Sequence, residues 1–261
     1  MPLRLESTVL RLSFRETLRR WGFPCVMAFA CLLTGLAHLV PYRFADATLA
    51  RWESLWQRLD LLIWLLSAAV ISFAASPASV FWGSCRTGRS VSHPFRLAAA
   101  GLMGQVGAGM AALTLVATLD RGLAWSRGTL SLAPLSSVSL LWIVLAVAGR
   151  CCCAFALARL CSALLRPVAG SLLLLVIFLA AAERARSEAI AGPLAEAILG
   201  LLPDARNLAV VPAEVLNSGR SIGLEAFRCI ALVFVYNTLY VVALDRQGGG
   251  LGLLDHESAG G

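Results

Sequence analysis

Residues 139–182 read SLLWIVLAVAGRCCCAFALARLCSALLRPVAGSLLLLVIFLAAA, and this stretch decides the fold. It carries only three charged residues, Arg150, Arg159 and Arg166, and Pro167 follows the last of them. A helix needs about 20 apolar residues to cross a bilayer core roughly 30 Å thick. The stretch is long enough for two crossings and too apolar for a soluble surface. It predicts a membrane hairpin that turns at Arg166 and Pro167.

The composition of the whole chain agrees with this reading. The chain has 261 residues, of which 59% are hydrophobic and 14% charged, and its mean hydropathy is +0.78. Soluble domains carry about 25% charged residues. We therefore expect an all-α, polytopic, integral membrane protein. The formal net charge of +7 suits anionic lipid headgroups, and the absence of a clustered basic surface with interleaved aromatic residues argues against nucleic acid as a partner.

Hydrophobic segments along the chain predict six membrane spans. They cover about residues 23–42, 61–81, 96–119, 137–165, 168–182 and 225–244. An amphipathic connector at 43–60, a polar loop at 83–94 and a polar turn at 120–134 separate the earlier spans. Apolar pieces within 188–217 are too short to cross, so we expect external, re-entrant helices there. The Gly-rich residues 247–261 are expected to form a disordered cytoplasmic tail.

Residues 1–22 predict an amphipathic helix at the membrane interface rather than a signal peptide. At 100° per residue, one arc of this helix carries the apolar residues Leu3, Leu10, Phe14, Leu18 and Trp21. The neighbouring arc carries the basic residues Arg4, Arg11, Arg15 and Arg19. Ser13 and Glu16 fit a capping box that would start a second helical piece. The arginines serve either as a topology anchor or as a docking surface for a cytosolic partner.

The amino-terminal arginines also predict the topology. Six spans place both termini on one side, and positive charge near the first span favours the cytoplasm. We therefore expect a multi-pass protein of the prokaryotic inner membrane, with both termini cytoplasmic.

Few polar groups lie inside the predicted spans. Arg150 is costly there, and we expect it to snorkel or to form a salt bridge rather than to bind substrate. No Asp is expected in a span interior. Gln105 is expected to form an interhelical hydrogen bond, and His38 to be a packed interfacial histidine. Small residues recur every four positions in the third span, which predicts close helix or dimer packing; they are Ala100, Gly104, Ala108 and Ala112.

No catalytic, metal or cofactor site is expected. The three histidines are scattered, and the cysteines do not form paired ligand spacings. The run Cys151, Cys152 and Cys153 is read as packing residues, or as an acylation site if it lies at the membrane surface. An intramembrane enzyme would need converging ionisable groups, and it is the least favoured class.

The order of these elements resembles the permease subunits of type-2 ABC exporters. The local matches are residues 160–167 (LCSALLRP), residues 201–208 (LLPDARNL), residues 236–240 (YNTLY), and Asp245 with Arg246. The inner loop departs from the family, because residues 85–89 (CRTGR) lack its glutamate and Gly-Thr pair.

The resemblance implies a dimer with a second copy or a related permease, and two separate ABC ATPase subunits. The ATPases would dock at Arg11, Arg15, Arg19, Arg86 and Arg89. An external gate would include Leu201, Pro203, Asp204 and Asn207. The chain itself would hydrolyse no ATP, and it carries no GxxxxGK[ST] phosphate loop. The alternative is a non-transporting membrane scaffold or assembly protein.

Overall fold

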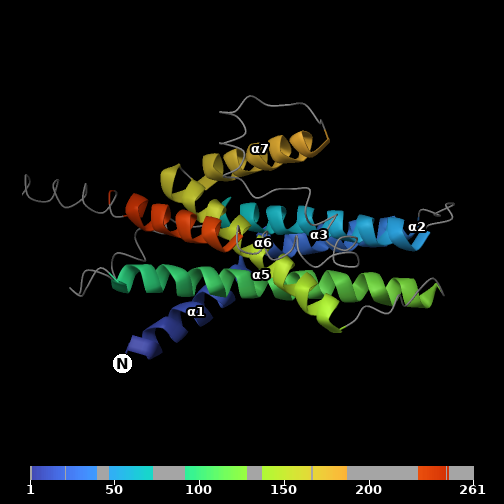
Figure 1. The fold of residues 1–261 in the computed structure, drawn as a ribbon, viewed down its shortest axis with the longest axis horizontal. Coiled ribbons are helices and arrows are strands. Elements are labelled where there is room, and N and C mark those ends of the chain that lie inside the picture. The colour runs from blue at the N-terminus through green and yellow to red at the C-terminus, as the bar shows by residue number, and fades with distance from the viewer. Residues whose placement is uncertain are drawn as a thin grey trace, which may run out of the picture.

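The computed structural model describes residues 2–20, 22–39, 47–72, 92–127, 137–165, 167–186, 229–244 and 246. Every regular element in these ranges is a helix, as the composition predicts (Figure 1). The predicted external helices at 188–217, most of the loop at 83–94 and the tail at 247–261 lie outside the described residues.

The amino-terminal helix α1 spans Pro2–Arg19 without interruption. The capping box predicted at Ser13 was wrong, because no new helix starts there. The Ser13 hydroxyl instead donates a hydrogen bond to the carbonyl of Gly101, at 2.7 Å. Because this hydroxyl bonds to α5, it is not available to cap the start of a helix within α1.

Helices α2 (Gly22–Leu39) and α3 (Ala47–Ser72) follow. The sequence predicts a connector over residues 43–60 and a separate span from residue 61. The structure instead shows one helix that continues from Ala47 through this boundary. The polar residues around Arg58 and Asp60 did not end the helix, because both side chains find partners on neighbouring helices.

Helix α5 spans Ser92–Ser126, and in Figure 1 it runs along the full bundle. It begins before the predicted residue 96, with Pro94 in its first turn, where proline costs little. The polar turn predicted from Asp120 onward was wrong for residues 120–126, which are helical. Asp120 points back into the bundle and pairs there, so it does not break the helix.

Helices α6 (Ser137–Leu164) and α7 (Pro167–Arg186) break at the predicted place. Pro167 is the first residue of α7, the position that tolerates proline best. Close packing at the turn requires glycine, since a Cβ on Gly170 would lie 2.9 Å from the carbonyl oxygen of Cys161. The two helices therefore form a tight hairpin.

Helix α6 forms the centre of the bundle. Apart from Arg150 and Arg159, its apolar residues are distributed around the whole helix, which is typical of a helix surrounded by others, and Figure 1 shows it crossing obliquely among its neighbours. Cys151, Ala154, Phe155 and Ala158 are almost completely buried. A further helix, Cys229–Leu244, packs on the same core and is called here the last helix.

Three helices are long and apolar enough to cross a membrane. They comprise Gly22–Leu39, Phe95–Ser126 and Val147–Leu164 within the described ranges. Shorter apolar helices cover Val168–Ile177 and Cys229–Leu244. These lengths and compositions are those of a membrane protein built from packed helices.

Candidate functional site

A buried ion pair joins α3 to α6. Arg150 Nε lies 2.7 Å from Asp60 Oδ1, and Arg150 Nη2 lies 3.2 Å from Asp60 Oδ2. The two side chains are only 4% and 11% exposed, respectively. A two-point contact of this kind is directional, so it holds the helices in one register. Of the two structural roles expected for Arg150, the structure shows the salt bridge.

The acidic partner was missed by sequence reasoning. Asp60 was placed in the connector, and no Asp was expected inside a span, yet it is buried within α3. The sequence did contain a sign that Asp60 is buried, because it lies between Leu59 and Leu61 and directly before an apolar run. A guanidinium in the fourth span requires a carboxylate, and Asp60 is followed directly by a predicted span.

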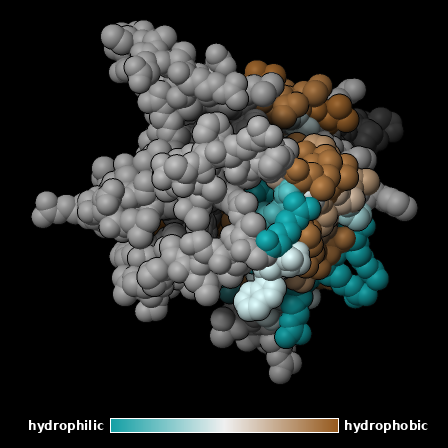
Figure 2. Space-filling view, turned by 90° about the vertical axis from the view of Figure 1, so that its right-hand side faces the viewer, coloured by the Kyte–Doolittle hydropathy of each residue, from teal (hydrophilic) through white to brown (hydrophobic). Residues whose placement is uncertain are grey.

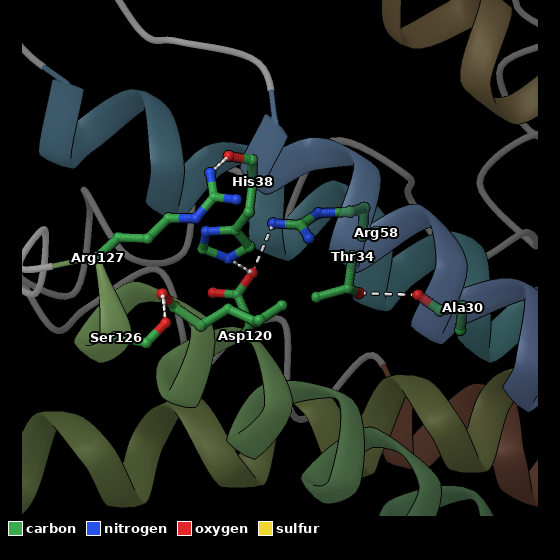
Figure 3. Close-up of polar contacts among 8 residues, drawn as sticks. Ala30, Thr34, His38, Arg58, Asp120, Ser126 and Arg127 are labelled. Carbon is green, nitrogen blue, oxygen red and sulfur yellow. Dashed lines mark hydrogen bonds and ion pairs between the residues drawn. The ribbon is translucent and has the colours of Figure 1, made fainter.

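A second polar cluster lies where α2, α3 and α5 meet (Figure 3). Asp120 Oδ1 accepts contacts from His38 Nε2 and from Arg58 Nη2, each at 3.0 Å. All three side chains are at most 16% exposed. Arg127 also donates to the carbonyl of His38 at the carboxyl end of α2, where helix carbonyls lack partners of their own. The expected packed histidine is thus part of an ionic cluster.

This cluster lies at one end of the bundle. Figure 2 faces that end and shows hydrophilic side chains beside hydrophobic surface. Leu39 and Trp125 are exposed there, whereas Asp120 is enclosed. Such a mixed surface is typical of helix ends at a membrane boundary. The His38 cluster and the Asp60–Arg150 pair together attach α3 to α2, α5 and α6.

A third polar contact lies near the opposite end of α5. Arg159 of α6 donates from Nη1 to the carbonyl of Ala98, at 2.7 Å. Its guanidinium carbon lies 4.4 Å from the ring centroid of Tyr240 in the last helix, a cation–π contact. One side chain therefore links three helices.

Helix α1 lies against α5 through a narrow seam. A Cβ on Gly104 would lie 2.5 Å from the carbonyl oxygen of Leu10, so the two backbones are in direct contact. Thr17, one turn on from Ser13 in α1, is also buried. Only part of the apolar arc predicted for α1 is packed, since Phe14 lies against Gly107 and the core, whereas Leu10 and Leu18 are 42% and 38% exposed.

The predicted docking residues divide into two groups. Arg11, Arg15 and Arg19 are exposed on α1. At 100° per residue they lie opposite the seam formed by Ser13 and Thr17. The other two docking candidates, Arg86 and Arg89, lie outside the described residues. The predicted external gate also lies outside them; its residues are Leu201, Pro203, Asp204 and Asn207.

The predicted small-residue stripe lies inside the bundle. Gly104, Ala108 and Ala112 are buried, and Ala100 is half-buried. Gly104 contacts α1 of the same chain. Gln105 was expected to hydrogen-bond between helices, but its Oε1 is buried without a hydrogen-bond partner in the described part of the chain.

The cysteines of α6 are packing residues. Cys151 and Cys153 are fully buried, and Cys153 Sγ lies 3.2 Å from the carbonyl oxygen of Cys229 in the last helix. Within the described ranges, no group of three His, Cys, Asp or Glu side chains is placed to hold a metal ion.

Comparison of the chain with models of protein families, with curated proteins and with solved structures found no match.

Proposed function

We propose that the chain is the membrane-spanning permease subunit of an ATP-driven exporter of the type-2 ABC class. It pairs with a second copy of itself or with a related permease, and two separate cytosolic ATPase subunits drive it. Both termini lie in the cytoplasm of a prokaryotic cell. The helix order, with an amphipathic helix before a bundle of apolar helices, supports this proposal.

The proposal includes six spans, three more than length and hydropathy identify. At about 1.5 Å per residue, the 26 residues of α3 reach about 39 Å, and the 20 residues of α7 reach about 30 Å. Both lengths are enough to cross a hydrocarbon core of about 30 Å. The last helix, Cys229–Leu244, supplies the sixth crossing.

The observation that carries the proposal is the orientation of α1. Its small residue Ser13 bonds to α5 and Thr17 on the same side is buried, whereas its arginines lie on the opposite side. No ion pair links Arg11, Arg15 or Arg19 to a carboxylate in the described helices. Three exposed guanidinium groups four residues apart form a straight row that an acidic protein surface can bind.

Force applied to α1 would reach the bundle directly. The carbonyl oxygen of Leu10 faces Gly104 at a distance that leaves no room for a side chain, so α1 cannot slide without moving α5. The Asp60–Arg150 pair holds α3 to α6, so these helices move together. A motor docked on the arginine row would thus shift whole helices, which is the rigid-body motion that alternating access requires.

Purification from membranes with the natural partner tests the proposal. We expect an ATPase to co-purify with the wild-type chain in mild detergent. The triple variant Arg11→Glu, Arg15→Glu and Arg19→Glu should weaken its binding by about tenfold or more, since like charges across an interface repel. Circular dichroism should show an unchanged helix content.

Arg121→Glu provides the matched control, because Arg121 is exposed near the other end of α5. This control should retain wild-type ATPase binding. Wild-type binding by the triple variant would contradict the docking assignment. Recovery of the folded chain without any ATPase would contradict the transport role and favour a scaffold.

A further inference from the structure

Helices α1 and α6 both contact α5 at Gly101. A Cβ on Gly101 would lie 3.5 Å from Arg159 Nη2 of α6 and 3.9 Å from Val9 Cγ1 of α1. The carbonyl of the same residue accepts the hydrogen bond from Ser13 of α1. Helix α1 and the Arg159 side chain therefore rest on the same turn of α5.

Arg159 extends this junction to the last helix. Its guanidinium binds the Ala98 carbonyl and stacks on Tyr240. A small apolar cluster beneath it contains Ala98, Ala163, Tyr240 and Leu244, all nearly fully buried. Close packing transmits displacement because there is little free space to absorb it.

Helix α5 also contacts the last helix directly, since the ring centroids of Phe95 and Phe234 lie 5.7 Å apart. Residue contacts join α1 to α5 and to α2, and the Arg159 contacts join α5 and α6 to Tyr240. The guanidinium has a planar fork, so it can hold a carbonyl and an aromatic face at the same time. Arg159 is suited to transmit a movement of the Ala98–Gly101 turn to Tyr240.

We infer that Arg159 is a positioning residue that couples α1 to the last helix through the Ala98–Gly101 turn of α5. This inference rests on the proposed function for its biological meaning, since a motor docked on α1 would use the junction to move the last helix. The mechanical connection itself is a property of the described helices, so it can be measured without the motor.

Hydrogen–deuterium exchange of the full chain in lipid nanodiscs tests the connection. Gly104→Leu places a side chain against the backbone of α1 and should displace that helix. It should not weaken α5 itself, because leucine favours helix over glycine. We expect amide exchange in residues 236–244 to rise about tenfold, within the usual range of coupling between sites.

The matched control is Gly122→Leu, because a Cβ at Gly122 would meet nothing within 4 Å. It should leave exchange unchanged in both helices. Ser13→Ala is a milder perturbation that removes only the hydrogen bond to Gly101, and it should raise exchange in the same residues by a smaller factor.

The coupling itself is tested by combining Gly104→Leu with changes at Arg159. In an Arg159→Gln background, the increment from Gly104→Leu should fall below about twofold, because the guanidinium contacts with Ala98 and Tyr240 are lost and only the Phe95–Phe234 contact remains. Arg159→Lys keeps a charge over Tyr240 and a donor for Ala98, so it should preserve most of the increment. If Arg159→Gln does not fold, Tyr240→Leu serves instead and should also reduce the increment.

The inference is overturned if Gly104→Leu raises exchange in α1 alone, or if its full increment persists beside Arg159→Gln or Tyr240→Leu. The outcome is separate from that of the ATPase experiment. Intact coupling with no bound ATPase would refute the proposed function only, whereas bound ATPase with no coupling would refute this inference only.

Discussion

Removing one partner of the Asp60–Arg150 pair should destabilise the bundle strongly. Asp60→Leu leaves a guanidinium that is only 4% exposed without its bidentate carboxylate. Breaking a buried pair in this way costs about 3–5 kcal/mol, because the remaining charge loses its opposite charge and has little access to water. That cost corresponds to at least about a hundredfold change in the unfolding equilibrium. Arg150→Met should cost a similar amount, since it leaves the Asp60 carboxylate buried.

The double variant Asp60→Leu with Arg150→Met should be more stable than either single variant. It buries no charge, and replacing a buried pair by apolar residues of similar volume is often nearly neutral. The free energy of unfolding would be measured by denaturant titration in detergent micelles, with circular dichroism as the readout. The deviation from additivity in this double-mutant cycle should reach about 3 kcal/mol or more.

The exposed pair of Glu6 and Arg96 provides the control. Its atoms lie 4.0 Å apart, and the Arg96 side chain is 66% exposed. Arg96→Met should therefore change the stability by less than about 1 kcal/mol. The reasoning fails if Asp60→Leu is as mild as this control, or if the double variant costs as much as the two single variants added together.

Three further changes have expected outcomes in the same unfolding assay. Gly109→Leu should lower the stability by about 1–3 kcal/mol through overpacking, because a Cβ there would lie 2.8 Å from the Phe155 ring. Gly35→Leu is the control and should change the stability little, because a Cβ there would meet nothing within 4 Å. Asp120→Ala should cost about 1–3 kcal/mol, because His38 loses its acceptor; an unchanged midpoint would show that the cluster is not structural. Ser13→Ala should cost about 0.5–1.5 kcal/mol through the lost hydrogen bond to Gly101, and a gain in stability would contradict the assigned seam.

Several features of the fold followed from local patterns. Pro167 predicted the break between α6 and α7, because proline cannot continue a helix without losing a hydrogen bond. The long apolar run of α6 predicted a helix able to cross a membrane, and Val147–Leu164 is long and apolar enough to do so. The four-residue spacing of Arg11, Arg15 and Arg19 predicted that they lie on one side of α1. Each of these depends only on residues close together in the chain.

Features that depend on distant partners could not be predicted in this way. The ends of α3 and α5 were misplaced at Asp60 and Asp120, because a charged residue ends a membrane helix only when it lacks a partner. The partner of Asp60 is 90 residues away. The packed face of α1 was also unexpected, since Ser13 and Thr17 are less hydrophobic than Leu10 and Leu18.

The amino-acid sequence by itself determined that this protein is a set of apolar helices with an arginine-bearing amphipathic helix at its start. Hydropathy and helical period are sums over neighbouring residues, and they need no knowledge of the fold. The tertiary structure alone decided which carboxylate neutralises Arg150, which carbonyl holds Arg159, and which seam of α1 rests on α5. These depend on the short-range fit of surfaces from separate helices, which a linear pattern does not encode.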